Sequence, residues 1–285
     1  MRLIISSNCI TGGLAAGIKA MIPKAQVIPI ALPSIENLEK TNELTKSLQK
    51  ADVWITNDRF ELADGIPLKK IIRVPGFSFN AFHPDLIYAK KKSTNELTSQ
   101  HYNSRIAVWA YSRGLLPRDA AKLFNYRSYQ SLGYFDAWEI SVKLLKGKFE
   151  YFNYSADEFN TFFNRLKRRG LFMYSTNHPY SLVLVELAKL VAKKLGVSSN
   201  VINREIVIPD SFTDTIWPVY PEIGNELAIE GNYFWRMANV EIAGIENYLE
   251  FAYYSYQVQG ISPNDLIPAH NVTTKDIDSI LGSQL

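Results

Sequence analysis

One polar segment with the potential for chemistry is Asn8-Cys9, which directly follows the apolar run Leu3-Ile4-Ile5 and precedes the pair Gly12-Gly13. A turn from a strand into a helix exposes backbone N–H groups that favour anions and thiolates. Cys9 is therefore predicted to be a nucleophile or a thiol that faces a ligand, with Asn8 beside it. The competing interpretation is a buried cysteine that packs as a small hydrophobe.

A second segment, Phe82-His83-Pro84-Asp85, places an imidazole two residues from a carboxylate, with Tyr88 close by. His83 can act as a general base towards an alcohol, and Asp85 or another carboxylate can fix its tautomer and raise its basicity. The alternative is that His83 only caps a turn between aromatic core residues.

The third segment is Asn177-His178-Pro179, which precedes a long amphipathic pattern. The start of a helix offers unpaired N–H groups for a phosphate or an oxyanion, and His178 can donate to the same group. The alternative is a plain helix cap. Lys90, in a run of three lysines, is a further candidate for phosphate contact, although charge runs are usually solvated.

The elements that position these residues follow a βαβα pattern. Short apolar runs at 3–5, 27–30, 53–55 and 71–74 predict strands, with helices at 12–22 and 35–49 between them. This alternation predicts a parallel sheet, in which ligands bind beyond the carboxyl ends of the strands. Asn57 follows the third strand there, and two histidines at strand ends favour a shared crevice.

From about residue 93 the pattern is helical, with helices predicted at 117–125, 130–145, 181–195, 240–258 and 274–281. Ser155 and Glu158 form a capping-box pattern for another helix that ends near Gly170. The predicted fold class is α/β, with a small parallel-sheet N-terminal subdomain (1–90) embedded in a predominantly helical single-domain fold (91–285). One returning strand is expected near 171–175, and the whole chain is expected to form one compact unit.

Composition excludes several classes of protein. The formal charge is +3 over 285 residues, so no basic stripe suggests a nucleic acid. With one cysteine and four histidines at unrelated spacings, no metal site is expected. No run is long enough for a signal peptide core or a membrane span, and a cytoplasmic location is expected.

At these three segments the sequence resembles the WcbI family of polysaccharide-biosynthesis enzymes. The resemblance rests on Asn8-Cys9, on residues 75–88 with Phe82-His83-Pro84-Asp85 at their centre, and on Asn177-His178-Pro179. The segment Pro218-Val219-Tyr220-Pro221 is consistent with it, whereas the middle helices are not matched.

The resemblance implies an enzyme that binds coenzyme A and transfers an acetyl group from acetyl-CoA to a sugar hydroxyl in capsule or surface polysaccharide biosynthesis. We expect Asn8, Cys9, Asn57, Tyr88, Lys90, Asn177 and His178 to bind the donor. His83, Asp85, Cys9 and His178 are the expected catalytic residues. The partners are the acyl donor and a sugar or glycan acceptor. Two alternatives stay open: an esterase or deacetylase that acts on an acylated glycan, and a non-catalytic glycan-binding protein that uses the abundant aromatic residues.

Overall fold

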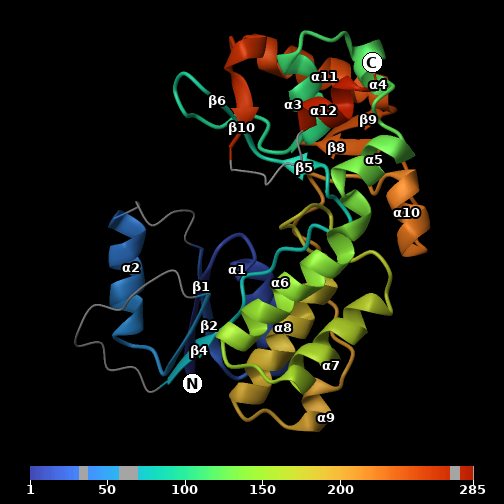
Figure 1. Ribbon diagram of the computed structural model, residues 1–285. Helices are drawn as coiled ribbons and strands as arrows, with labels where there is room; N and C mark the ends of the chain where they lie inside the picture. Colours follow the sequence, from blue (N-terminus) through green and yellow to red (C-terminus); the bar gives the residue numbers. More distant parts are fainter. Residues whose placement is uncertain (32–37, 58–69, 270–276, 285) are drawn as a thin grey trace. The chain divides into compact units, whose positions relative to one another are not determined.

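A four-stranded parallel sheet forms the N-terminal part of the chain, in the strand order β2-β1-β3-β4 (Figure 1). The computed structural model describes residues 1–31, 38–57, 70–269 and 277–284. The four strands lie where the apolar runs predict them, at Arg2–Ser7, Gln26–Ala31, Val53–Thr56 and Lys70–Arg73 for β1 to β4. The α/β class of the prediction is therefore confirmed. Leu3, Ile4, Ile5, Trp54 and Ile55 are fully buried in this sheet.

The chain divides into two compact units. Unit 1 comprises residues 1–78, 143–173 and 178–213, and unit 2 comprises residues 79–142, 174–177 and 214–285. The expectation that the whole chain forms one unit stays a prediction, and each unit is described by itself.

Unit 1 surrounds the parallel sheet with helices. Helix α1 (Thr11–Met21) packs on α8 (Ser181–Lys194), and α7 (Ala156–Lys167) also packs on α8. The capping box of α7 is confirmed, since Ser155 Oγ accepts the Glu158 N–H at 3.2 Å and the Glu158 carboxylate accepts the Ser155 N–H at 2.9 Å. The remaining elements of this unit are α2 (Leu38–Leu48), α9 (Ser199–Ile202) and most of α6 (Ala137–Tyr151). The first residues of two predicted helices, 35–37 and 274–276, lie outside the described residues.

Glycines bring α1 and α8 into close contact. A Cβ placed on Gly17 would lie 2.8 Å from the Cβ of Ala188, and a Cβ on Gly13 would clash with Leu184. Residues 13 and 17 thus face residues 184 and 188 in the same order, so the two helices run parallel. Their N-termini consequently lie at the same end of the pair.

Unit 2 consists of helices and short two-stranded pairings. Its strands pair as β5 with β7, β6 with β10, and β8 with β9, all antiparallel (Figure 1). The strands are β5 (Leu86–Ile87), β6 (Ala89–Lys91), β7 (Asn103–Ser104), β8 (Phe234–Met237), β9 (Val240–Ala243) and β10 (Leu266–Pro268). The helices are α3 (Arg105–Ser112), α4 (Pro117–Ala121), α5 (Tyr126–Leu132), η1 (Tyr134–Asp136), α10 (Pro221–Leu227), α11 (Ile245–Val258), η2 (Pro263–Asp265) and α12 (Ile277–Gly282).

Four predicted elements differ from the structure. The helix expected over 240–258 begins only at Ile245, because residues 240–243 pair with β8 as strand β9. The helix expected over 130–145 is interrupted at Gly133, whose φ of 77° is left-handed and ends α5 before η1 and α6 begin. The helix expected from Pro117 to Asn125 ends at Ala121. In place of the returning strand near 171–175 the chain makes one isolated bridge between Met173 and Pro179. The apolar residues at 171–174 pack into the protein interior there without pairing to a neighbouring strand.

Among the described residues, none of the helices combines the length and the apolar character that a transmembrane segment needs.

Candidate functional site

Three of the expected ligand-binding residues come together at the carboxyl edge of the parallel sheet. Ser6 of β1 pairs with Thr56 of β3, so Asn8 and Cys9 follow one strand and Asn57 follows its neighbour. The chain reverses its direction of winding between β1 and β3, which is the switch point where open α/β sheets bind ligands. The sequence-based expectation for this edge therefore has a structural basis within unit 1.

The turn at Asn8 is held by its own side chain. Oδ1 of Asn8 accepts the hydroxyl of Ser7 and the N–H of Ile10, both at 3.3 Å, and the carbonyl of Asn8 accepts the N–H of Thr11 at 3.1 Å. These bonds direct the amide nitrogen of Asn8 away from the turn, where it can donate to a ligand. Oδ1 of Asn57 is buried and has no hydrogen-bond partner within the described part of the chain.

Cys9 is exposed at the N-terminus of α1. The competing interpretation of a buried structural cysteine therefore does not apply. The first turn of α1 contains no acidic residue, and its N-cap Ile10 has no side-chain cap. Gly12 is exposed with nothing near the position of a Cβ, so a ligand can approach the backbone closely. This helix end is open to an anion.

His178 lies just before the N-terminus of α8, which runs parallel to α1. Its half-buried ring stacks on Phe212 with ring centroids 4.6 Å apart. The N–H of Ser181 donates to the carboxylate of Asp210 at 2.5 Å, so an acidic residue already occupies this helix end. Of the two helix starts, that of α1 is the better anion site.

Lys148 of α6 is a site residue that sequence reasoning missed. Its amine donates to Ser78 Oγ at 2.8 Å and to the Gly76 carbonyl at 3.4 Å, in the loop that follows the carboxyl end of β4. Burial lowers the pKa of this amine. Lys148 lies in the last turn of α6, where a cation is favourable without any ligand, so the sequence gives no sign of such a position.

His83 belongs to unit 2 and is almost fully buried. Its Nδ1 lies 3.3 Å from the carbonyl oxygen of Pro218. In the tautomer that carries its proton on Nδ1, the Nδ1–H group donates a hydrogen bond to this carbonyl. Nε2 then has the lone pair that a general base needs. The segment 218–221, which is consistent with the family resemblance, thus contributes a main-chain oxygen to the histidine.

Asp85 is the centre of a buried network in unit 2. Its carboxylate accepts the hydroxyls of Tyr134 and Tyr220, each at 2.7 Å, and the N–H of Ile106 at 3.2 Å. Burial raises the pKa of Asp85, and these hydrogen bonds oppose the rise. Burial also raises the pKa of both tyrosines. These contacts make Asp85 an anchor for three elements of unit 2, whereas its expected role in orienting His83 stays a prediction.

The structure joins Tyr88 and Asn177, two further residues expected to bind the donor. Oδ1 of Asn177 accepts the hydroxyl of Tyr102 at 2.5 Å, and Nδ2 donates to the hydroxyl of Tyr88 at 3.1 Å. The amide of Asn177 therefore links two tyrosine side chains within unit 2. Lys90 of β6 donates to Oδ1 of Asn95 at 2.7 Å, in the segment that follows this strand.

The expected site residues thus fall into two groups. Asn8, Cys9, Asn57 and His178 belong to unit 1, and His83, Asp85, Tyr88, Lys90 and Asn177 belong to unit 2. Among the described residues, no three His, Cys, Asp or Glu side chains cluster as the ligands of a metal ion would.

The fold and the sheet edge define an α/β protein with an anion-binding turn after its first strand. Residues 2–200 match the model of the family described as polysaccharide biosynthesis enzyme WcbI. Because this match covers well over half of the chain, the chain belongs to the WcbI family of polysaccharide biosynthesis enzymes.

A solved structure of WcbI, described as a novel polysaccharide biosynthesis enzyme, aligns with a TM-score of 0.67 over 99% of this chain and 95% of that one. That structure is the native protein without a disulfide bond between coenzyme A and one of its cysteines. The two sequences are 12% identical, so the likeness shows a shared fold. No curated protein matches the chain.

Proposed function

We propose that this protein is an O-acetyltransferase that moves an acetyl group from acetyl-CoA to a sugar hydroxyl in the assembly of a capsule or surface polysaccharide. The observation that carries the proposal is the exposed Cys9 at the open N-terminus of α1, beside Asn57 at the switch point of the sheet. Membership of a family of polysaccharide biosynthesis enzymes supports a sugar as the acceptor.

Coenzyme A is the ligand that the related structure suggests, since that structure is native WcbI without a disulfide bond between coenzyme A and one of its cysteines. In the present chain Cys9 is the single cysteine, so it is the residue that could form such a bond. We therefore infer that the sulfur end of coenzyme A is bound near Cys9. The N–H groups of the first turn of α1 would hold a negatively charged group of the ligand.

The reaction we propose forms a bond between the sugar oxygen and the thioester carbonyl carbon and breaks the carbon–sulfur bond. The proton of the hydroxyl passes to His83, and coenzyme A leaves as a thiolate that takes up a proton. The amide of Asn8, held by Ser7 and Ile10, and the amide of Asn57 are the donors we assign to the oxyanion. His178 is assigned to a phosphate or to protonation of the thiolate, as the sequence suggests.

Direct transfer needs no covalent enzyme intermediate and is our first choice. In the alternative route, the Cys9 thiolate attacks the thioester first and the sugar then attacks the acylated cysteine. A Cys9→Ser variant that keeps transfer activity would support direct transfer.

Calorimetric titration with coenzyme A and acetyl-CoA tests the donor. We expect binding in the micromolar range or tighter, weakened by Cys9→Ala or by His178→Ala. His101→Ala is the matched control, because His101 is exposed and carries no assigned role. Absence of binding at millimolar coenzyme A would refute the acetyltransferase proposal.

The base is tested with His83→Gln, which should abolish transfer and leave coenzyme A binding intact. Full activity in this variant would remove His83 as the base. Release of acetate from acetyl-CoA without any sugar would instead indicate a hydrolytic enzyme.

A further inference from the structure

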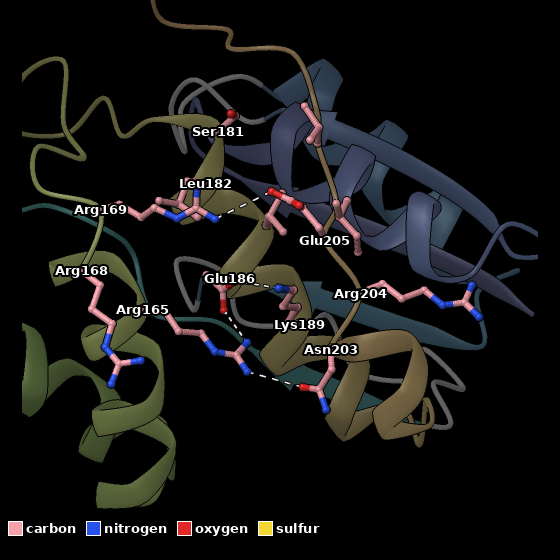
Figure 2. Close-up of a pocket in the computed structure, with 13 residues that line it drawn as sticks. Arg165, Arg168, Arg169, Ser181, Leu182, Glu186, Lys189, Asn203, Arg204 and Glu205 are labelled. Atoms are coloured by element: carbon pink, nitrogen blue, oxygen red, sulfur yellow. Dashed lines mark hydrogen bonds and ion pairs between the residues drawn. The ribbon is translucent and has the colours of Figure 1, made fainter.

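A charged pocket of about 460 Å³ lies in unit 1, between the end of α7, one face of α8 and residues 203–207 (Figure 2). Its lining is unusually basic. Five cationic side chains, Arg165, Arg168, Arg169, Lys189 and Arg204, face only two acidic ones, Glu186 and Glu205.

The floor of the pocket holds two cations on one buried carboxylate. Arg165 lies 3.0 Å from Glu186 Oε2, and Lys189 lies 2.8 Å from Glu186 Oε1. The side chains of Glu186 and Lys189 are only 7% and 12% exposed. One carboxylate thus faces two positive charges and balances only one of them. A net positive charge remains, shared between the largely buried Lys189 and Arg165, whose side chain is 38% exposed. Removing an unbalanced charge from water is costly, and an anionic ligand would offset that cost.

Donors remain available on these cations. Arg165 donates from one amino group to Glu186 and from the other to Asn203 Oδ1 at 3.5 Å. Figure 2 shows the amine of Lys189 directed at the same Glu186 carboxylate. Both groups keep further N–H donors, since a guanidinium carries five and an ammonium three.

Arg169 lines the rim, 3.8 Å from Glu205. That pair is exposed, and an exposed pair at this distance binds weakly. Its guanidinium can therefore turn to an incoming anion. Nearby, Glu158 already pairs with Lys193 at 3.2 Å, so these two charges largely offset each other.

The helix dipole accounts for only part of this arrangement. Arg165, Arg168 and Arg169 lie at the C-terminal end of α7, where cations are favourable without any ligand. Lys189 lies in the middle of α8, where no helix terminus favours it. It forms an (i, i+3) ion pair with Glu186 of the same helix, and the same carboxylate also holds Arg165 of α7, so the two cations share one anion.

We propose that this pocket binds the phosphate group of a phosphorylated ligand, held by Arg165, Lys189 and Arg169. The pocket is larger than one phosphate, and Leu182, Val185 and Val207 offer apolar surface to the carbon skeleton of the ligand. A sugar phosphate and coenzyme A share this chemistry. The inference goes beyond the acetyltransferase proposal and does not depend on it.

Calorimetric titration with sodium pyrophosphate at low ionic strength tests the inference. Binding should weaken about tenfold in Arg169→Gln and in Lys189→Gln, because each loses a charge-assisted hydrogen bond. Lys167→Gln is the matched control: it removes the same charge from the same turn of α7 and does not line the pocket. Thermal melting checks that Lys189→Gln still folds, and the exposed Arg169 provides the second variant.

Specific weakening in the two pocket variants alone would support the site. Equal weakening in Lys167→Gln, or no binding of pyrophosphate at millimolar concentration, would overturn it. Titration of wild type and Arg169→Gln with glucose 1-phosphate and with coenzyme A then identifies the source of the phosphate, because only the natural class should lose affinity in the variant. The acetyltransferase proposal is tested by acetyl transfer and by Cys9→Ala, whereas this proposal is tested by pyrophosphate binding and by the pocket variants. Failure of one proposal can therefore be told apart from failure of the other.

Discussion

The contact between α1 and α8 sets the position of the candidate donor site, and Gly17→Ala is the substitution that tests it. A Cβ at residue 17 would lie 2.8 Å from the Cβ of Ala188 and 3.6 Å from the Cα of Val185. Ala188 is fully buried and has no flexible side chain that could turn away. The two helix axes must therefore move apart.

Two effects of opposite sign determine the magnitude. An alanine in a helix interior is favoured over glycine by about 1 kcal/mol. Overpacking of a buried contact costs about 1–3 kcal/mol. We expect the free energy of unfolding of Gly17→Ala to fall by up to about 2 kcal/mol.

Gly147→Ala is the matched control. Gly147 lies inside α6, and nothing lies within 4 Å of the position of its Cβ. The same substitution there should raise the free energy of unfolding by about 1 kcal/mol. The difference between the two variants in urea unfolding isolates the cost of the helix contact.

The double variant Gly17→Ala/Ala188→Gly exchanges the methyl group between the helices. If the helices pack as described, the effects of the two substitutions on the free energy of unfolding should be strongly non-additive. We also expect Gly17→Ala to weaken coenzyme A binding and the double variant to restore it. Equal stabilisation by Gly17→Ala and Gly147→Ala would refute the close parallel packing of α1 on α8. The inference that both helices start at the donor site would then lose its basis.

Two further predictions concern single polar groups. Burial raises the pKa of Asp85 above its ordinary value of 3.8, so the folded state holds the proton of this carboxyl more tightly than the unfolded state does. The free energy of unfolding should therefore decline as pH rises from about 4 through the folded pKa. Urea unfolding of wild type and of Asp85→Asn at several pH values checks this, and an identical pH dependence in both proteins would contradict it. Ser155→Ala removes the acceptor of the α7 capping box and should lower the free energy of unfolding by about 1 kcal/mol, measured by urea unfolding; an unchanged midpoint would show that water replaces the cap at no cost.

The parallel sheet was predictable because its signals are local. Each strand is a short apolar run, and each lies between polar or helical segments of the expected length. Asn8, Cys9 and Asn57 were predictable for the same reason, since a residue that follows a strand of a parallel sheet lies at the ligand-binding edge. The interruption of the helix at Gly133 also has a local cause, but glycine within a helical pattern is compatible with either outcome.

The partners of buried polar groups were not predictable. Asp85 meets Tyr134 and Tyr220, which lie 49 and 135 residues away in the chain. No period or motif indicates which distant hydroxyl satisfies a carboxylate. The proximity of Asp85 to His83 in sequence gives no indication of these two tyrosine partners.

The basic pocket was not predictable from the sequence either, because the sequence does not show which charged side chains meet. Arg168 and Arg169 follow Lys167 in a charge run that the sequence explains as a favourable helix end. That explanation concerns one helix alone. Lys189 and Glu186 come from α8, and only the packing of α8 on α7 brings two cations onto one buried carboxylate. The charge of a local segment therefore says little about a site, whereas the balance of charges on packed neighbouring elements indicates where an anion would be stabilised.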